Sequence, residues 1–186
     1  IGFDQFQKSA TLSAFSLKDI YIDKDKIYVS YTEEIKDNCW NTSIIHGNIN
    51  YNNIIFEKLF SSKDCIITKG SNQNGGRIVN FDENHILLSV GDYRSRSLPQ
   101  DKKSINGRIL KINISNSNHE IVSMGHRNPQ GLYFDKKNNL ILVTEHGPYG
   151  GDEINLIETN KINKDDPLNY GWAVVSAGEH YCSENS

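Results

Sequence analysis

Short runs of β-branched, aliphatic and aromatic residues alternate with polar segments along most of the chain. The clearest pairs of such runs are 20–22 with 27–31, 77–81 with 85–90, and 132–134 with 140–144. The segments between paired runs contain only Asp, Asn, Glu and Lys, so each pair is predicted to form a β-hairpin. No segment keeps a helical apolar period over about 11 residues or more, and an all-β chain is therefore predicted.

The three hairpins resemble copies of one repeating unit. In each, an aromatic residue or Ile precedes an Asp, a short turn and an aliphatic strand, and the markers Asp23, Asp82 and Asp135 lie 59 and 53 residues apart. Further predicted hairpins lie between the markers, at 43–45 with 54–56 and at 108–112 with 120–122. Four strands per repeat favour the blade of a β-propeller. The alternative is an antiparallel sandwich, whose turns also recur regularly.

The repeat length limits how many blades this chain can hold. A single domain over 1–186 divides into units near 17–70, 71–125 and 126–186, which is a little over three blades. Propellers close with about four to eight blades. The chain is thus predicted to be a partial propeller, completed by missing C-terminal blades or by another copy in a homo-oligomer.

Composition and charge exclude two classes of partner. The formal net charge is -3 and no cluster of Lys and Arg could follow a phosphate backbone, so no nucleic-acid partner is expected. No apolar run approaches the roughly 20 residues of a membrane span. The first residues also lack the basic start and apolar core of a signal peptide. The composition predicts a soluble globular protein and leaves its compartment open.

The three cysteines match no zinc-binding pattern. Cys39 and Cys65 flank the predicted hairpin 41–60, whose two ends must lie close together, so a disulfide bond between them is feasible. The alternative is that Cys39, Cys65 and Cys182 are all buried or free thiols. Both interpretations stay open, and export of the protein would favour the disulfide.

Three segments of the C-terminal half combine glycines with charged and aromatic residues, at 125–132, 144–155 and 169–172. Loops at strand ends commonly carry function, which makes these segments candidates for a site. Asp152 and Glu153 offer hard oxygen ligands suited to calcium. Arg127 keeps its charge and suits an anionic partner. The alternative is a set of tight turns with a solvated acidic pair.

Taken together and in this order, GHRNPQGL at 125–132, TEHGPYGGDEIN at 144–155 and NYGW at 169–172 resemble a known signature. It is that of the pyrroloquinoline quinone (PQQ)-dependent soluble aldose sugar dehydrogenases, also called the glucose/sorbosone dehydrogenase family. GGR at 75–77, VGD at 90–92 and NGRIL at 106–110 are similar to that family too.

The resemblance runs from about residue 27 to residue 181. It implies a six-bladed propeller, periplasmic or secreted, that oxidises aldose sugars or related alcohols with PQQ and calcium and passes the electrons to an acceptor. In such chemistry a base takes the proton of the sugar C1 hydroxyl while its hydride goes to the quinone. Calcium and a neighbouring cation stabilise the developing charge.

The resemblance also implies roles for single residues. Arg127 and Asn128 match the pair that faces the quinone and the sugar, and Asp92 matches the carboxylate that orients the catalytic base. The base itself is a histidine in the family, four residues before the arginine of GGR, and this chain has Gln73 there. A glutamine amide can hydrogen-bond a substrate but cannot accept its proton near neutral pH.

The same resemblance implies two calcium sites. The carbonyls of Gly147 and Pro148 match the ligands of the calcium ion that holds the quinone. Glu153 and the main chain of Tyr170 match a second, structural calcium ion. Three functions are therefore considered: a PQQ- and calcium-dependent dehydrogenase, a catalytically impaired propeller that binds sugar, quinone or calcium, and a structural module in which calcium only rigidifies the loop 151–153.

Overall fold

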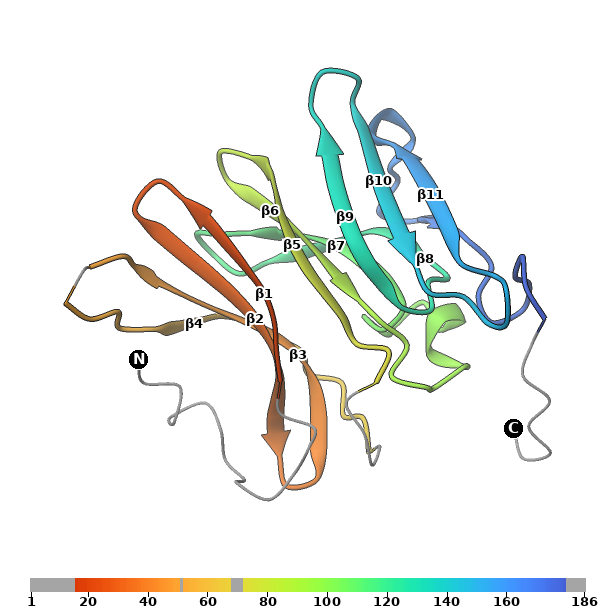
Figure 1. Ribbon diagram of the computed structural model, residues 1–186, viewed down its shortest axis with the longest axis horizontal. Helices are drawn as coiled ribbons and strands as arrows, with labels where there is room; N and C mark the ends of the chain where they lie inside the picture. The colour runs from red at the N-terminus through yellow and green to blue at the C-terminus, as the bar shows by residue number, and fades with distance from the viewer. Residues whose placement is uncertain (1–15, 51, 68–71, 180–186) are drawn as a thin grey trace.

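A computed structural model describes residues 16–50, 52–67 and 72–179 of the chain. These residues form three β-sheets that follow one another along the sequence and are antiparallel, apart from one short strand that returns to the second sheet (Figure 1). The described part contains no α-helix, only 3₁₀ turns at Leu98–Gln100 and Thr159–Lys161. The prediction of an all-β chain is confirmed. Within the same residues, no helix has the length and apolar character needed to cross a membrane.

The first sheet has the strand order β1-β2-β3-β4. It consists of β1 (Ser16–Asp23), β2 (Lys26–Lys36), β3 (Cys39–Asn48) and β4 (Glu57–Ser61). The hairpin of β1 and β2 is the predicted one, and its turn places Lys24 at a φ of 54°, in the left-handed region.

One strand of the first sheet was predicted in the wrong place. The apolar run 54–56 precedes β4, which begins at Glu57 and pairs there with His46. Before the pairing starts, the chain crosses Gly47 so closely that a Cβ at Gly47 would lie 2.5 Å from the carbonyl oxygen of Ile55. Ile54 and Phe56 pack in the buried cluster of the first sheet, so burial rather than a ladder accounts for the apolar run.

The second and third sheets contain the remaining predicted hairpins. The second sheet has the order β12-β8-β7-β6-β5 and the third the order β11-β10-β9. Their strands are β5 (Gly75–Asp82), β6 (His85–Val90), β7 (Arg108–Asn113), β8 (His119–Met124), β9 (Pro129–Asp135), β10 (Leu140–Glu145), β11 (Glu153–Glu158) and β12 (Leu168–Asn169). Only β12 pairs in parallel, as a short addition to β8.

The second sheet lies between the other two, and β6 shows why. Because successive side chains of a strand face opposite sides, β6 can pack on both. Ile86 and Leu88 pack in one buried cluster with Ile44 of the first sheet, and Leu87 packs in another with Ile141 of the third. The first strands β1, β5 and β9 lie next to one another (Figure 1). The fold thus brings the residues that precede β5 and β9 to the same end of neighbouring strands.

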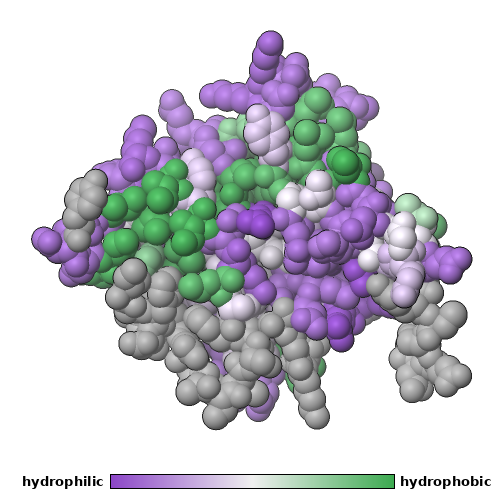
Figure 2. Space-filling model, viewed as in Figure 1, coloured by the Kyte–Doolittle hydropathy of each residue, from purple (hydrophilic) through white to green (hydrophobic). Residues whose placement is uncertain are grey.

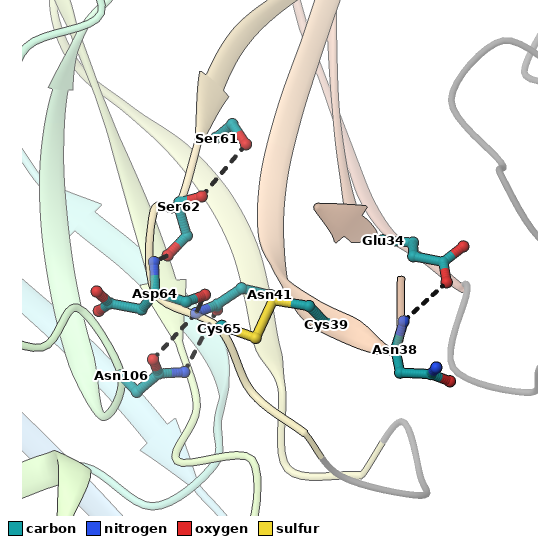
Figure 3. The surroundings of a disulfide bond; sticks show 9 residues. All are labelled: Glu34, Asn38, Cys39, Asn41, Ser61, Ser62, Asp64, Cys65 and Asn106. Atoms are coloured by element: carbon teal, nitrogen blue, oxygen red, sulfur yellow. Dashed lines mark hydrogen bonds between the residues drawn. A yellow bond between two sulfur atoms is a disulfide. The ribbon is translucent and has the colours of Figure 1, made fainter. Parts of the chain in front are cut away.

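A disulfide bond joins Cys39 and Cys65, with 5.1 Å between the Cα atoms (Figure 3). Beside it the main chains of Trp40 and Ile66 exchange hydrogen bonds of 3.0 and 3.2 Å. This answers the question that the sequence left open for these two cysteines. Cys182 lies outside the described residues.

Candidate active site

Three loops that are distant in sequence are joined by main-chain hydrogen bonds at one end of the second and third sheets. The loop after β6 donates from Asp92 N to Arg127 O at 2.8 Å and from Tyr93 N to Gln73 O at 3.0 Å. The contact is so close that a Cβ at Gly91 would lie 1.9 Å from the Gln73 carbonyl oxygen. Glycine is therefore required at this position, and it brings the three predicted catalytic residues, Gln73, Asp92 and Arg127, together.

Gln73 connects the other two through its side chain. In the amide orientation that its neighbours require, Nε2 donates to Asp92 Oδ1 at 2.7 Å and Oε1 accepts from Arg127 Nη2 at 2.9 Å. The backbone of Gln73 has a φ of 60°, which is uncommon for a residue with a side chain. The amide thus forms a neutral bridge between a carboxylate and a guanidinium.

Asp92 is fully buried, and its carboxylate accepts further hydrogen bonds from Arg94 N at 2.8 Å and from the indole Nε1 of Trp172 at 2.7 Å. Burial raises the pKa of Asp92 to about 6, and the negative charge of Glu145 acts in the same direction. The two hydrogen bonds and the positive charge of Arg127 lower that pKa without cancelling the effect of burial. The carboxylate is ionised at neutral pH and titrates just below it.

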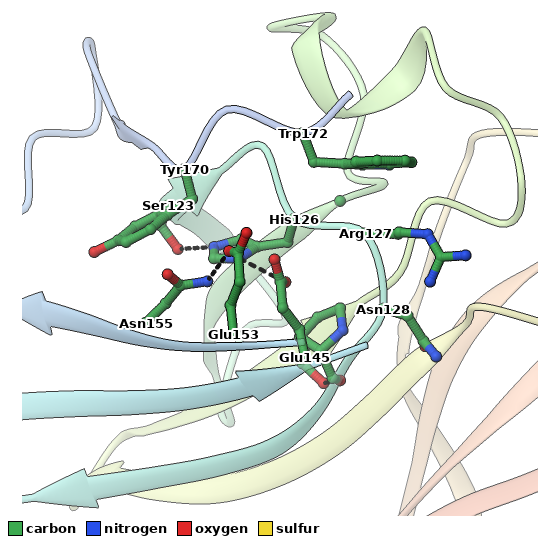
Figure 4. A network of polar contacts seen from close by, with 12 residues as sticks. Ser123, His126, Arg127, Asn128, Glu145, Glu153, Asn155, Tyr170 and Trp172 are labelled. Carbon is green, nitrogen blue, oxygen red and sulfur yellow. Dashed lines mark hydrogen bonds and ion pairs between the residues drawn. The ribbon is translucent and has the colours of Figure 1, made fainter. Parts of the chain in front are cut away.

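Arg127 and Asn128 lie between β8 and β9 (Figure 4). Arg127 donates from Nη1 to the carbonyl oxygen of His146 at 2.8 Å, and its Cζ lies 5.4 Å from the centroid of the Trp172 ring. Asn128 accepts from Gly75 N at 3.2 Å through Oδ1, and its carbonyl accepts from His146 N at 3.1 Å. Both residues thereby connect the network to the loop that follows β10.

That loop forms one wall of a surface depression of about 380 Å³. The lining residues are Arg127, His146, Gly147, Pro148, Tyr149, Gly150 and Asp152. A Cβ at Gly147 would lie 1.7 Å from the carbonyl oxygen of Gly151, so the turn excludes any side chain there. Asp152 Oδ1 accepts from Gly147 N at 3.1 Å, and its Oδ2 lies 3.1 Å from Nδ1 of His146. The depression therefore combines a guanidinium with closely turned main chain.

The two residues predicted for a second calcium ion lie on β11 and just after β12. The carboxylate of Glu153 accepts hydrogen bonds from Asn155 Nδ2 at 3.2 Å and from Ala177 N at 3.3 Å. Tyr170 donates its hydroxyl to Leu156 O at 2.6 Å. Among the described residues, no cluster of three or more His, Cys, Asp or Glu side chains is suited to a metal ion. The proposed calcium ligands are mostly main-chain carbonyls, so calcium binding stays a prediction.

Sequence reasoning missed two features of the site. His126 is fully buried, with Nδ1 at 3.0 Å from Glu145 Oε2 and Nε2 at 2.8 Å from Ser123 Oγ, and Tyr170 stacks on its ring (Figure 4). Strand alternation could have identified Glu145, because every second residue of β10 from Ile141 to Glu145 is buried. The second feature is the contact of Trp172 with Asp92, for which no sequence pattern exists.

A family model and several known proteins match this chain in sequence. A family model described as Glucose / Sorbosone dehydrogenase matches residues 6–186. Aldose sugar dehydrogenase YliI of Escherichia coli is 28% identical over 172 residues, which is 84% of this chain and 44% of that protein. Quinoprotein glucose dehydrogenase B of Acinetobacter calcoaceticus is 40% identical over 80 residues, covering 43% of this chain and 13% of that protein.

Solved structures have the same fold. The apo-form of the soluble aldose sugar dehydrogenase from Escherichia coli superposes with a TM-score of 0.76 and 26% identity, over 91% of this chain and 52% of that one. The PQQ-bound form of aldose sugar dehydrogenase from Streptomyces coelicolor gives a TM-score of 0.66 and 24% identity, over 89% and 50%. The chain spans less than half the length of these curated relatives and about half of these solved structures.

Proposed function

Since the chain belongs to the glucose/sorbosone dehydrogenase family, we propose that it is part of a PQQ- and calcium-dependent enzyme that oxidises aldose sugars or related alcohols. The names of the relatives support the reaction class, because one acts on aldose sugars and another is a quinoprotein. The PQQ-bound structure from Streptomyces coelicolor shares the fold and motivates the choice of cofactor.

The position of Arg127 is the observation that carries the proposal. Its guanidinium donates a hydrogen bond to Gln73, which in turn donates to Asp92, and it also lines the depression beside Gly147 and Pro148. An anionic quinone in this depression would meet a buried cation, and a calcium ion beside it would meet main-chain oxygens, which are the ligands it prefers. When bound, PQQ would accept the hydride removed from the sugar, which carries both electrons of the oxidation. The buried guanidinium and the closely turned main chain of this loop support a site for both groups.

The protein's own residues would bind and orient the sugar. Arg127 would stabilise negative charge that develops near it, and Asn128 would present its amide to the same region. The proton of the sugar hydroxyl needs an acceptor, and the neutral amide of Gln73 is not one. Asp92 is the negatively charged group of the network and could accept a proton, yet it is buried and already accepts three hydrogen bonds.

This arrangement favours a second candidate function, a catalytically impaired protein that binds sugar, quinone or calcium. Gln73 is the observation behind it, because its amide nitrogen and its amide oxygen are both hydrogen-bonded to other residues of the protein. General-base catalysis contributes about 10²- to 10⁴-fold, so loss of the base would leave binding without fast turnover.

We extend the proposal to the rest of the protein. The outer sheets expose apolar side chains, among them Ile20 and Ile22 of β1 and Ile154 and Leu156 of β11, and apolar areas are visible on the face drawn in Figure 2. Further blades, or another copy of the chain, would cover them and close a six-bladed ring from the units 17–70, 71–125, 126–186 and their successors. A periplasmic or secreted location is proposed, in keeping with the disulfide bond.

The test uses the intact protein with added PQQ and calcium. PQQ binding is measured by equilibrium dialysis, and turnover by reduction of an electron-accepting dye with a panel of aldoses. Arg127→Ala should lower turnover about 10²-fold or more, while Arg77→Ala, which removes an exposed arginine paired with Asp19, should change it little. PQQ binding without turnover would select the second candidate. Failure to bind PQQ in the presence of calcium would overturn the first candidate and the quinone-binding form of the second. It would leave a protein that binds only sugar or calcium, or the structural module.

A further inference from the structure

We infer that Trp172 is a positioning residue of this site, whose indole N–H orients the buried Asp92 carboxylate and whose ring supports the Arg127 guanidinium. The catalytic consequence rests on the proposed function. The contacts themselves belong to the protein without ligands, so they can be tested separately from it.

The main chain holds Trp172 in place. The segment 168–172, named here the return segment, leaves the third sheet and lies along the end of β8 in the second. Tyr170 N donates to Met124 O at 2.9 Å and Trp172 N donates to Gly125 O at 3.0 Å. From the other side, Gln100 Nε2 donates to Trp172 O at 2.6 Å. The backbone of Trp172 is therefore fixed by the fold, and its side chain is buried where it stands.

The indole N–H supplies a hydrogen bond that Asp92 cannot obtain from water. Oδ1 accepts from Arg94 N and from Gln73, whereas Oδ2 accepts from Trp172 Nε1 at 2.7 Å. Asp92 is fully buried, so with the indole in place no solvent reaches Oδ2. An indole can only donate, and a donor favours the ionised form of a carboxylate. The hydrogen bond from Trp172 thus lowers the pKa of Asp92, whereas burial raises it.

The ring of Trp172 also contacts positive charge. The Cζ atoms of Arg127 and Arg96 lie 5.4 and 5.8 Å from its centroid, within the range of a cation–π interaction of about 6 Å. Gln73 and the His146 carbonyl accept hydrogen bonds from the guanidinium nitrogens of Arg127, and the guanidinium carbon lies over the ring of Trp172. One side chain therefore contacts both charged members of the site.

The two contacts can be separated by substitution. Trp172→Phe keeps an aromatic ring for Arg127 but removes the N–H together with part of the fused ring, whereas Trp172→Ala removes the whole aromatic group. The charged groups that act on Asp92 are Arg127 and, from β10, Glu145, and neither substitution changes their charge. The buried Trp40, equally enclosed but beside the disulfide bond, offers a matched control in Trp40→Phe.

The first measurement needs no ligand. The indole N–H resonance of Trp172, identified by its loss in Trp172→Phe, should shift with the titration of Asp92, with a midpoint near pH 6. The shift should vanish in Asp92→Asn. In Trp172→Phe, the carboxyl carbon resonance of Asp92 should show a pKa raised by about one unit, which corresponds to the loss of one hydrogen bond to the ionised form. Trp40→Phe should leave that pKa as in the parent.

The second measurement uses PQQ with calcium. Trp172→Ala should weaken PQQ binding by about tenfold through Arg127, and Trp172→Phe should restore most of it. The inference is wrong if the indole resonance does not titrate with Asp92, or if Trp172→Phe leaves the pKa of Asp92 unchanged. Failure of the parent protein to bind PQQ would count against the proposed function alone, because the titration in the ligand-free protein would still stand.

Discussion

Asp92 should lower the stability of the protein at neutral pH, and Asp92→Asn should expose that effect. The carboxylate is fully buried, and its pKa is raised from 3.8 to about 6 in the folded state. The unfolded chain binds this proton more weakly than the folded protein. Its contribution to the free energy of unfolding is therefore fully present below pH 3.8 and is lost as pH rises through about 6.

The magnitude follows from the difference in pKa. About 2 units correspond to about 3 kcal/mol over the whole pH range, of which about 2 kcal/mol falls between about pH 4.5 and about pH 8. The Asn variant lacks this titration. It also disturbs the hydrogen bonds from Arg94, Gln73 and Trp172, because one of its side-chain atoms is a donor facing donors. That loss is about 1 to 3 kcal/mol and does not depend on pH.

The assay is urea unfolding of the parent and of Asp92→Asn at a series of pH values. The difference in free energy of unfolding, variant minus parent, should rise by about 2 kcal/mol from about pH 4.5 to about pH 8. The other titrating groups are present in both proteins, so their contributions cancel in this difference. Asp166→Asn is the control, since that carboxylate is 81% exposed and should give a flat difference. A flat difference for Asp92→Asn as well would refute the reasoning that burial dominates at this carboxylate.

Three further predictions concern the base, the disulfide bond and calcium. Gln73→His should raise sugar oxidation by about 10²-fold or more in the intact protein with PQQ and calcium, because it places a proton acceptor next to Asp92; normal PQQ binding with unchanged turnover would show that more than the base is missing. Replacing Cys39 and Cys65 by Ser should lower the free energy of unfolding by about 3 to 4 kcal/mol, as measured in urea, and an unchanged midpoint would contradict a bond that closes 26 residues of sequence. A chelator should lower the melting temperature, with recovery on adding calcium and a smaller effect in Glu153→Gln; a melting temperature independent of free calcium would count against both calcium sites.

Local physical rules account for most of the strands that the sequence predicts. The hairpin of β1 and β2 forms where four charged residues separate two β-rich runs, and short runs of charged residues and Asn separate the paired strands at 82–84 and 135–139. The start of β4 was misplaced because an apolar run signals burial and not pairing. Ile54 and Phe56 pack with the core of the first sheet, while Ile55 is 73% exposed. Register needs the partner strand, which the local sequence does not contain.

The candidate site also has one part that the sequence predicts and another that only the structure shows. Gln73, Asp92 and Arg127 are identifiable from motifs because short glycine-containing loops at strand ends keep a recognisable pattern. The hydrogen bonds that Gln73 makes to the other two are not identifiable, since they depend on the packing of the second sheet against the third. Amide orientation and burial together decide whether that glutamine contacts a substrate or bridges two charges.

By itself, the sequence determined the all-β architecture, the hairpins and the loops that carry the chemistry, because turn residues and period-two alternation act within a few residues of one another. Only the tertiary structure decided the state of Asp92. Its indole partner, Trp172, lies 80 residues away, on a return segment whose path is fixed by the end of β8. The pKa of a buried carboxylate depends on which donors and charges surround it in space, and those neighbours come from strand β10 and from loops far apart in the sequence.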